Sequence, residues 1–511
     1  MKRAAPAQSS QASAPDQPPQ NGVPAPTARG HASLPPNLSG NLAAALTAAA
    51  AALARVAQGK SLDQALEAAS QGLAAPERAA AQDIAYTACR RLNLLDAVAA
   101  RLMKKSNPAI DYLVRAACSQ LIDHAPQRAH VIVDQAVTAA AGIANGAFKG
   151  LVNGVLRSFL RGQDPLLREL RADEAVRLAY PHWWIERVRH AWPARWEAIL
   201  AAGNQPPPMT LRVNLRRGTV EAYAERLAAA GITAHRSGPV ALTLERPLPA
   251  ARLPGFAAGD VSVQDLGAQC AAYFLGAAAT RDADAPLNTA LTLNADATFN
   301  ATATRSAAIN RAARPFPLRV LDACAAPGGK TAHLLESLDC DVTALDSDAA
   351  RLAAVRANLM RLGLDADCKA ADAADLNAWW DGTPFDLVLL DAPCTASGVV
   401  SRHPDSKWLK RAGDAAKLKR IQLRLLDALW QVLKPGGTLL YATCSVFPEE
   451  NTGQVDAWLT RHTDARRVAL PALPGVPGAG DGSSSGLEWI GGQLLPDAAH
   501  DGFFYVLIEK I

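Results

Sequence analysis

The stretch LRVLDACAAPGGKTAHLLESL, residues 318–338, decides the fold class of this chain. An apolar run typical of a β-strand leads into a glycine-bearing turn, and apolar residues at helical spacing follow from Thr331 to Leu338. Strand-like runs recur downstream in VTALD, CKAAD, FDLVLLD and GTLLYAT, with helical patterns between them. Because strands that alternate with helices form parallel sheets, residues 318–511 are predicted to be an α/β domain with a doubly wound, mostly parallel sheet.

The turn after the first strand has the composition of a ligand-binding loop. Gly328 and Gly329 let the backbone approach a bound molecule closely. The turn matches neither the dinucleotide fingerprint G-x-G-x-x-G nor a Walker loop, so a phosphate cradle is disfavoured.

Aspartates stand at or just after the ends of four predicted strands. They are Asp322, Asp346, Asp372 and Asp391. One such aspartate is more often a helix cap or turn residue, but four around one glycine turn favour a binding site. A carboxylate such as Asp346, 24 residues after Asp322, suits the two hydroxyls of a ribose. The pattern therefore indicates a nucleoside ligand.

Two cysteines follow the last two of these strands. Cys394 lies in LLDAPCTASG after Phe385–Leu390, and Cys444 lies in YATCSVFPEEN after Gly437–Tyr441. The carboxyl ends of parallel strands meet at one edge of a sheet, so we expect two thiols at one active-site rim and covalent chemistry with a separate release step. A lone cysteine is more often a small hydrophobe in a core. That interpretation is kept for Cys89, Cys118, Cys270, Cys340 and Cys368.

The 511 residues exceed one ordinary domain, and 49% of them are hydrophobic. Residues 1–38 contain almost no large apolar side chain and are predicted to be a disordered tail. Residues 39–165 carry helical periodicity and are predicted to form an all-helical domain. Its last element, FKGLVNGVLRSFLR, is expected to bury Leu151, Val155 and Phe159.

Residues 166–275 change character and are predicted to be a small α+β middle module. A Trp-rich helical piece precedes strand-like MTLRVN, ALTLE and VSVQD. Residues 276–317 are rich in Ala, Thr, Asn and Asp without periodicity, so they are expected to form a mobile, low-complexity insert.

Composition excludes several classes of protein. The eight cysteines form no C-x-x-C pair and no cluster with histidine, which argues against a metal site and against a secreted disulfide framework. No signal peptide is visible, and the Ala-rich run from Leu42 to Leu53 is too short to cross a membrane. We therefore expect a cytoplasmic protein with no membrane segment and no metal.

Basic residues gather next to the expected rim. Between Ser401 and Arg424 there are eight Lys or Arg and two Asp, a net charge of +6, although the whole chain carries only +4. Such a run is usually a solvated helix face, but beside a nucleoside site it suits the phosphates of RNA. His403 and Trp408 would add stacking or phosphate contacts.

The motifs DACAAPGGKT, LLDAPCTASGV, RHPDSKW, YATCSVFPEEN and the closing DGFFY together resemble the bacterial 16S ribosomal RNA cytosine-C5 methyltransferases of the Fmu/Sun type. The resemblance runs from about Leu42 to Ile511, because the N-terminal helices with FKGLVNGVLR resemble the NusB-like RNA-binding domain of that family. The long tail and the insert depart from the family pattern. So does Thr-Ala-Ser-Gly after Cys394, where Ser-Ala-Thr-Gly is more typical.

The resemblance implies a Rossmann-like methyltransferase domain that uses S-adenosyl-L-methionine. It implies that the cofactor is held by Cys324, Ala325, Ala326, Pro327, Gly328, Gly329 and Lys330, with Asp346 on the ribose, Asp372 near the adenine and Asp391 near the reacting end. Cys444 is the expected nucleophile, Cys394 the residue that assists release, Asp391 the hydrogen-bond donor to the base, and Lys330 a source of positive charge. The expected partner is 16S rRNA, free or within a small-subunit assembly intermediate, and the chain is expected to be a monomer.

Other functions remain open on the sequence. Transfer RNA could be methylated by the same chemistry, and only a comparison of substrates separates the two. A non-catalytic RNA-binding or assembly factor is disfavoured by the intact pair of Cys394 and Cys444. A DNA cytosine methyltransferase is disfavoured because those enzymes have the nucleophile in a Pro-Cys motif, whereas this chain adds Thr-Cys-Ser. A metal-dependent hydrolase lacks a ligand cluster.

Overall fold

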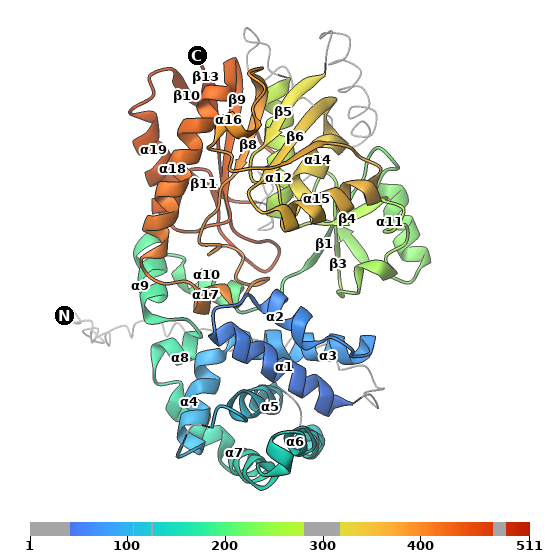
Figure 1. Cartoon of the computed structure of the whole chain (residues 1–511), viewed down its shortest axis with the longest axis vertical. Helices are drawn as coiled ribbons and strands as arrows, with labels where there is room; N and C mark the ends of the chain where they lie inside the picture. Colours follow the sequence, from blue (N-terminus) through green and yellow to red (C-terminus); the bar gives the residue numbers. More distant parts are fainter. Residues whose placement is uncertain (1–40, 106, 124–125, 281–316, 474–486) are drawn as a thin grey trace, which may run out of the picture.

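A computed structural model describes residues 41–105, 107–123, 126–280, 317–473 and 487–511. The predicted tail at 1–38 and all but a few residues of the predicted insert lie outside these ranges. Figure 1 shows a helical region at one end of the molecule, a large sheet flanked by helices at the other, and a small strand-containing module beside the large sheet.

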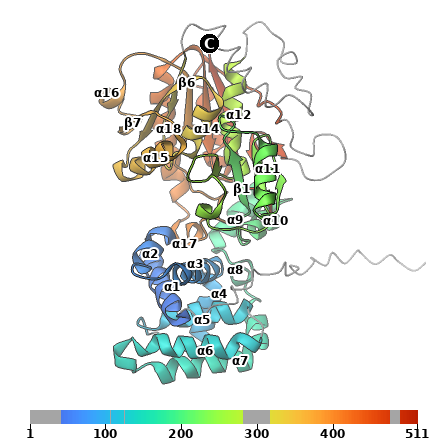
Figure 2. The same cartoon turned by 90° about the vertical axis from the view of Figure 1, so that its right-hand side faces the viewer.

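The N-terminal region is entirely helical within the described ranges (Figure 2). Its helices are α1 (Leu42–Ala57), α2 (Leu62–Ala69), α3 (Ala75–Arg90), α4 (Leu92–Leu102), α5 (Asp111–Asp123), α6 (Pro126–Ala141) and α7 (Lys149–Leu170), with a 3-10 turn η1 (Ala144–Gly146). The Ala-rich run predicted to be too short for a membrane forms α1, which packs against α2, α3, α5 and α6. None of the helices in the described ranges has the length and apolar character needed to span a membrane.

The helix formed by FKGLVNGVLR buries two of the three residues expected to be buried. Val152, Val155 and Phe159 are buried in α7, together with Leu156. Leu151 is 47% exposed, so its predicted burial is wrong. Spacings of three, four and seven residues from Val152 align the buried side chains along one stripe, whereas Leu151 begins a neighbouring stripe that faces solvent.

Short helices connect the helical region to the rest of the chain. They are α8 (Glu174–Leu178), α9 (His182–Ala191) and α10 (Trp196–Gly203). Trp184 and Ile185 of α9 pack in one cluster with Val446 and Phe447, which follow Cys444. The Trp-rich piece therefore buttresses one of the two cysteine loops.

The middle module is an antiparallel sheet of four strands in the order β2-β3-β1-β4, with one helix. Its elements are β1 (Met209–Val213), α11 (Val220–Ala229), β2 (Ala234–Arg236), β3 (Ala241–Leu244) and β4 (Val261–Val263), with a 3-10 turn η2 (Ala250–Arg252). The strands predicted from MTLRVN, ALTLE and VSVQD are all present. The edge strand β2, with two exposed residues, was not predicted because it lacks an apolar run.

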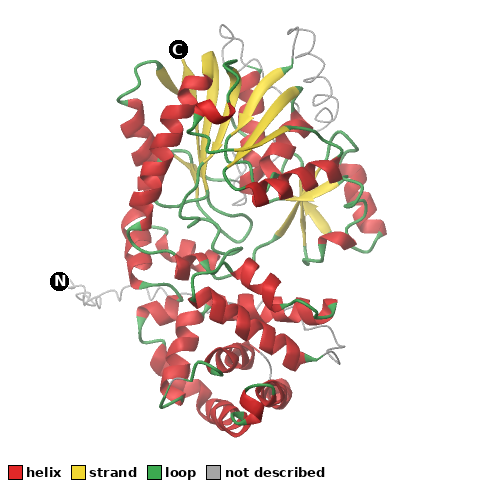
Figure 3. Ribbon diagram, in the orientation of Figure 1, coloured by secondary structure: helices red, strands yellow, loops and turns green. Residues whose placement is uncertain are grey.

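The C-terminal region is a doubly wound sheet flanked by helices (Figure 3). Its strands lie in the order β11-β12-β13-β9-β8-β5-β6-β7, and β10 pairs with β13. The pairs among β5, β6, β7, β8 and β9 are parallel, as predicted, whereas β13 pairs antiparallel with β9. The strands are β5 (Leu318–Asp322), β6 (Cys340–Asp346), β7 (Asp367–Ala370), β8 (Phe385–Asp391), β9 (Leu433–Thr443), β10 (Ala465–Val468), β11 (Trp489–Ile490), β12 (Gln493–Leu494) and β13 (Phe503–Lys510). The helices are α12 (Leu266–Ala279), α14 (Gly329–Ser337), α15 (Ala349–Leu362), α16 (Leu376–Trp379), α17 (Ser406–Leu409), α18 (Asp414–Val432) and α19 (Thr452–Leu459), with a 3-10 turn η3 (Pro448–Glu450).

Successive residues of the central strands pack into two different hydrophobic cores. In β9, Leu440 and Ala442 pack with α12, α14 and α15, whereas Leu439 and Tyr441 pack with α18 and α19. Because side chains alternate across a strand, helices on both faces require strands that are apolar at every position. The central strands accordingly read as continuous apolar runs.

Helix α12 corrects two predicted boundaries. It packs against α14, β9 and β13, so residues 266–275 belong by packing to the large sheet and not to the middle module. The helix continues to Ala279, so residues 276–279 are helical rather than part of an irregular insert. The cause is its composition: buried Cys270, Phe274 and Leu275 need an apolar surface, which the large sheet provides.

A buried ion pair fastens the middle module to the large sheet. Arg212 of β1 donates two hydrogen bonds of 2.8 Å to the carboxylate of Glu336 in α14, and a third to the carbonyl oxygen of Gly329. Both side chains are almost fully buried. Removing one partner would leave the other charge buried without compensation.

Replacing Arg212→Met is expected to destabilise the chain by about 3–5 kcal/mol, because Glu336 loses its counter-charge. The thermal unfolding midpoint should fall by at least about 6 °C. The matched control is Arg466→Met, which removes the exposed pair with Glu509 in the same domain and should cost less than about 1 kcal/mol. Equal shifts in the two variants would contradict this account of the pair.

Candidate active site

The glycine turn follows β5 and is fixed by the end of β6. Gly328 has φ +93°, and a Cβ atom there would lie 3.0 Å from Val355, so the position requires glycine. Asp346 accepts hydrogen bonds from the N–H groups of Ala326 and Asp348, at 3.2 and 3.0 Å. The turn is thus held in a shape that keeps backbone rather than side chains at its surface.

Asp322 lies beneath this turn and is fully buried. Its Oδ2 accepts a 2.6 Å hydrogen bond from the Thr331 hydroxyl, while Oδ1 has no hydrogen-bond partner in the described part of the chain. Burial raises the pKa of Asp322 to about 7; the Thr331 hydrogen bond opposes this rise and the charge of Asp391 adds to it. Asp322 is therefore a buried acid that titrates near neutral pH.

The remaining strand-end carboxylates line the same edge of the sheet. Asp372, two residues past β7, accepts hydrogen bonds from the N–H of Ala374 and from Arg424. Burial acts to raise the pKa of Asp372, but these two partners outweigh it and lower the pKa. Cys324 is partly exposed, and burial followed by the neighbouring carboxylates raises the pKa of its thiol. A glycine cradle with carboxylates on the next two strands suits a nucleoside ligand.

The register of β8 and β9 brings the two predicted thiols together. Asp391 pairs with Ala442 across these parallel strands, and the Ala392 N–H donates to the carbonyl oxygen of Ala442 at 2.8 Å. The chain beyond each strand then places Sγ of Cys394 3.4 Å from Sγ of Cys444. Both thiols are free and partly exposed.

Lys330 reaches this pair from the glycine turn. Its Nζ donates a 2.6 Å hydrogen bond to Oδ2 of Asp391 and lies 5.1 Å from the ring centre of Phe503. Burial acts to lower the pKa of Lys330, but the attraction and hydrogen bond of Asp391, with the negative charges of Cys444 and Asp322, raise it. Lys330 is therefore a retained positive charge beside the thiols.

A polar cluster that was not predicted from the sequence lies behind the cysteines. Thr395, Ser397, Ser445 and Glu450 form a buried hydrogen-bonded group that joins the two cysteine loops. The hydroxyl residues next to each cysteine were visible in CTASG and TCS. The sequence alone does not show which of Glu449 and Glu450 is buried, because their burial depends on the folded structure.

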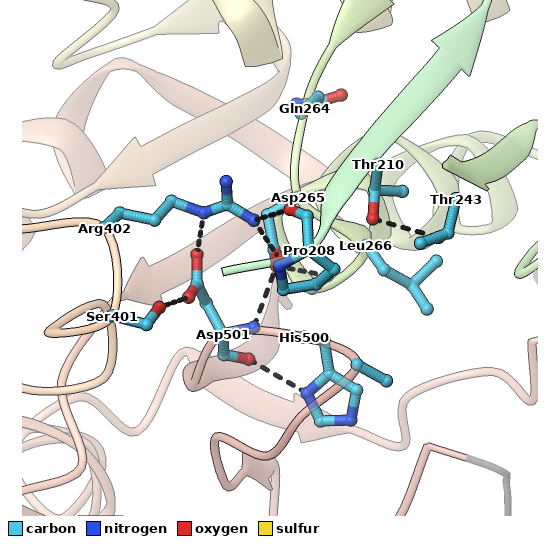
Figure 4. Close-up of polar contacts among 12 residues, drawn as sticks. Pro208, Thr210, Thr243, Gln264, Asp265, Leu266, Ser401, Arg402, His500 and Asp501 are labelled. Atoms are coloured by element: carbon cyan, nitrogen blue, oxygen red, sulfur yellow. Dashed lines mark hydrogen bonds and ion pairs between the residues drawn. The ribbon is translucent and has the colours of Figure 1, made fainter. Parts of the chain in front are cut away.

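Arg402 connects three separate segments next to the cysteine loops (Figure 4). Its guanidinium donates to Asp265, which precedes α12, and to Asp501 of the closing DGFFY motif. Burial and then the charge of Asp265 raise the pKa of Asp501 to about 6, against the effect of Arg402. The next residue, Gly502, donates its N–H to the carbonyl of Gly398, whose own N–H donates to the carbonyl of Cys444.

The segment RHPDSKW docks onto the helical domain, which corrects part of the predicted RNA surface. Lys407 is fully buried and donates to the carbonyl of Arg90 at 2.8 Å, and Trp408 Nε1 donates to the carbonyl of Cys89 at 2.7 Å. Asp405 accepts the N–H of Leu62 at the start of α2. Trp408 packs against the helical core but stays partly exposed, so its contact with RNA remains a prediction. His403 stays half-exposed, 3.7 Å from Asp63.

Several other basic residues of this run lie on the surface. Exposed Lys417, Arg420 and Arg424 lie on α18, whose buried Gln422 donates to the carbonyl of Pro393, next to Cys394. A positive face thus flanks the thiols directly. The described ranges contain no group of three or more His, Cys, Asp or Glu arranged to hold a metal ion.

Three family models match the chain. A model described as 16S rRNA methyltransferase RsmB/F matches residues 317–509. The ferredoxin-like domain of RsmF/B-like methyltransferases matches residues 180–251, and the NusB family matches residues 43–161. The matches fall on the large sheet, the middle module and the helical region in turn.

Curated proteins are similar over nearly their whole length. Ribosomal RNA small subunit methyltransferase B of Pseudomonas syringae pv. tomato is 40% identical over 473 residues, covering 91% of this chain and 96% of that protein. The protein of the same name from Vibrio cholerae is 39% identical with the same coverage. The crystal structure of PH0851 has a TM-score of 0.67 at 23% identity, covering 92% of this chain and 99% of that one, and supports the fold alone.

Asp322 gives a pH-dependent test of this geometry. A folded-state pKa of about 7 lies above the unfolded value near 3.9, so its stability contribution is full below about pH 4 and is lost as pH rises to about 7. Asp322→Asn does not titrate. Wild type should therefore lose more than about 1 kcal/mol of stability relative to Asp322→Asn between pH 4.5 and 7.5, measured by urea unfolding. Exposed Asp341→Asn controls for loss of a carboxylate, and a constant difference between wild type and Asp322→Asn would contradict the assignment.

Proposed function

Because the chain belongs to the RsmB/F family of S-adenosylmethionine-dependent 16S rRNA methyltransferases, we propose that it methylates C5 of a cytosine through a covalent bond between a cysteine and C6 of the base. The observation that carries the proposal is the pair of free thiols with their sulfur atoms 3.4 Å apart, at the ends of adjacent parallel strands. Two thiols at one rim suit a reaction that forms and then breaks a covalent bond.

Cys444 is the proposed nucleophile. Cytosine C5 reacts poorly with an electrophile until a thiolate adds to C6, because that addition moves an electron pair into the ring and turns C5 into an enamine carbon. The ammonium of Lys330 favours a thiolate nearby. Cys444 thus supplies the electron pair and C5 forms the new bond to the methyl group.

Asp391 is proposed to stabilise the charge that develops on the ring. Lys330 occupies Oδ2, while no hydrogen bond to Oδ1 is found in the described ranges. A proton taken up when the base binds, and shared between Oδ1 and N3, would neutralise the electron density arriving at N3. Asp391 is partly exposed, which suits contact with a ligand.

Cys394 is proposed to assist release. After methyl transfer, the C5 proton leaves to a base and the electrons of that bond restore the ring double bond. The electrons of the C6–S bond then return to the Cys444 sulfur. Cys394 is the acid–base group within reach of Cys444 on the neighbouring loop.

The glycine turn and strand-end carboxylates fit the cofactor that the family uses. The proposed contacts are Cys324 through Lys330 around the chain of the ligand, with Asp346 on the ribose, Asp372 near the adenine and Asp391 near the reacting end. The hydrogen bond from Ala326 to Asp346 supports this, since it holds the turn against the end of β6 and brings the two proposed contact regions together. S-adenosylmethionine supplies an electrophilic methyl group when bound.

The RNA is proposed to lie across the NusB-like helices and the basic face of α18. The target cytosine must leave its stack for C6 to be reached, so a loop or locally opened helix suits the site better than an intact duplex. An assembly intermediate that exposes such a loop is the proposed substrate, acted on by a monomer of this chain.

The direct test incubates wild type, Cys444→Ala and Cys394→Ala with labelled S-adenosylmethionine and either 16S rRNA lacking C5-methylcytosine or unmodified transfer RNA. Wild type should place label in 5-methylcytosine of the 16S rRNA alone. Cys444→Ala should abolish transfer, and Cys394→Ala should accumulate a covalent protein–RNA adduct, visible as a denaturation-resistant complex.

Several outcomes would overturn the assignments. An unchanged rate in Cys444→Ala, or no adduct in Cys394→Ala where wild type turns over, would reject the roles of the two thiols. Label in transfer RNA would change the substrate. Binding of RNA without label in any base would favour an assembly factor.

Lys417→Gln with Arg420→Gln tests the basic face of α18. Each phosphate contact removed should reduce the slope of log affinity against log salt by about 0.7–0.9 and weaken binding at low salt. Arg466→Gln, exposed on β10 away from this face, is the matched control. Identical salt slopes for the double variant and the control, measured by fluorescence anisotropy with 16S rRNA fragments, would place the RNA elsewhere.

A further inference from the structure

Glu450 is a fully buried carboxylate that belongs to the last residues of the YATCSVFPEEN motif. It closes the 3-10 turn η3, six residues after Cys444. Tyr441 of β9 donates its hydroxyl to the Glu450 carbonyl at 2.7 Å. The backbone of Glu450 is thus fixed to the strand that carries Cys444.

The carboxylate of Glu450 binds both cysteine loops. Oε1 accepts the N–H of Thr395 at 3.0 Å and the amide of Gln422 at 3.2 Å. Oε2 accepts the hydroxyls of Thr395 at 2.5 Å and Ser445 at 2.7 Å. Thr395 directly follows Cys394 and Ser445 directly follows Cys444, so a single side chain joins the two residues next to the two thiols.

Burial raises the pKa of Glu450, whereas the hydrogen bonds from Thr395, Ser445 and Gln422 oppose this rise and favour the ionised carboxylate. The N–H groups on Oε1 can only donate, and each hydroxyl can turn its proton towards Oε2. No Lys, Arg or His forms an ion pair with Glu450 in the described ranges. Its negative charge therefore acts on its surroundings without a neighbouring cation to cancel it.

The two thiols interact with different charged groups. The hydrogen bond with Cys444, burial, the charge of Cys444 and the charge of Glu450 all raise the pKa of Cys394. On the opposite side, the negative charge of Cys444 is among the causes that raise the pKa of Lys330, so this ammonium and Cys444 are electrostatically coupled. One thiol thus faces an anion and the other faces a cation.

We propose that Glu450 is a positioning residue that gives the two cysteines different roles. It holds the Cys394 loop against the Cys444 loop. Its charge keeps the proton of the pair on Cys394 and the negative charge on Cys444. When the pair loses one proton to solvent, the Cys394 thiol can donate a hydrogen bond to the Cys444 sulfur, 3.4 Å away. The sulfur that attacks is selected before RNA binds.

The inference rests on the proposed two-thiol function, but it can be tested without RNA or cofactor. The measurement is the rate of alkylation of Cys394 by iodoacetamide against pH, resolved by peptide mass spectrometry, in full-length Cys444→Ala protein. With Cys444 replaced, Glu450 is the remaining one of the two negative charges that raise the pKa of Cys394. Adding Glu450→Gln should speed alkylation of Cys394 at least tenfold at pH 8 and move the pH midpoint down by about one unit.

Two controls separate charge from damage to the fold. Glu449→Gln changes the neighbouring residue, which pairs with Arg187 at the surface, and should leave the Cys394 rate unchanged. Cys89 and Cys118 are buried in the helical core and should stay unmodified. Glu450→Asp retains the charge and should keep the Cys394 rate within about threefold of the Cys444→Ala parent.

Each outcome decides the proposal. An unchanged Cys394 midpoint in a folded Glu450→Gln protein would overturn it. If Cys89 becomes modified in Glu450→Gln, the fold of that variant is damaged and Glu450→Asp is used instead. A slow alkylation of Cys394 in Glu450→Asp supports the charge effect, and a fast alkylation in a folded protein rejects it. A failure of methyl transfer in the labelling assay would reject the proposed function and leave the alkylation result standing.

Discussion

The parallel register between β8 and β9 is the constraint on which the site depends. Pairing of Asp391 with Ala442 makes the two strands end together, so the loops that follow start side by side. Side chains on adjacent strand ends then meet although fifty residues separate them. A shift of one residue would turn every side chain of β9 to the other face. Continuous apolar packing on both faces of β9 resists such a shift.

Two different elements of the fold place charged side chains around the thiols. Lys330 comes from the glycine turn and brings a cation, held by Asp391 at 2.6 Å. Glu450 comes from η3 and brings an anion, held only by hydrogen-bond donors. In a site of low dielectric such fixed charges act strongly on neighbouring thiols. Two chemically identical side chains can thereby differ in reactivity.

The cysteine loops also connect to the rest of the molecule through the segment RHPDSKW. Arg402 binds Asp265 and Asp501, while Lys407 and Trp408 reach the carbonyl ends of α3. The helical domain therefore docks on the chain that leads away from Cys394. RNA held by that domain would be positioned relative to the thiols by a buried, hydrogen-bonded interface rather than by a flexible linker.

Local periodicity and the residues next to strand ends were enough to predict the alternation of strands and helices, the glycine turn and the two cysteines. The sequence also indicated the helical domain and the burial of Val155 and Phe159 in α7, although Leu151 is exposed. It could not assign α12 to the large sheet, since an apolar helix does not reveal its partner.

The burial and the partners of the charged side chains could not be predicted from the sequence. Lys407 and Arg420 look alike in one basic run, yet the fold buries the first and exposes the second. Glu449 and Glu450 are adjacent, yet only Glu450 turns inward to both cysteine loops. Burial and long-range contacts set these differences, because the cost of desolvating a charge depends on neighbours that are distant along the chain.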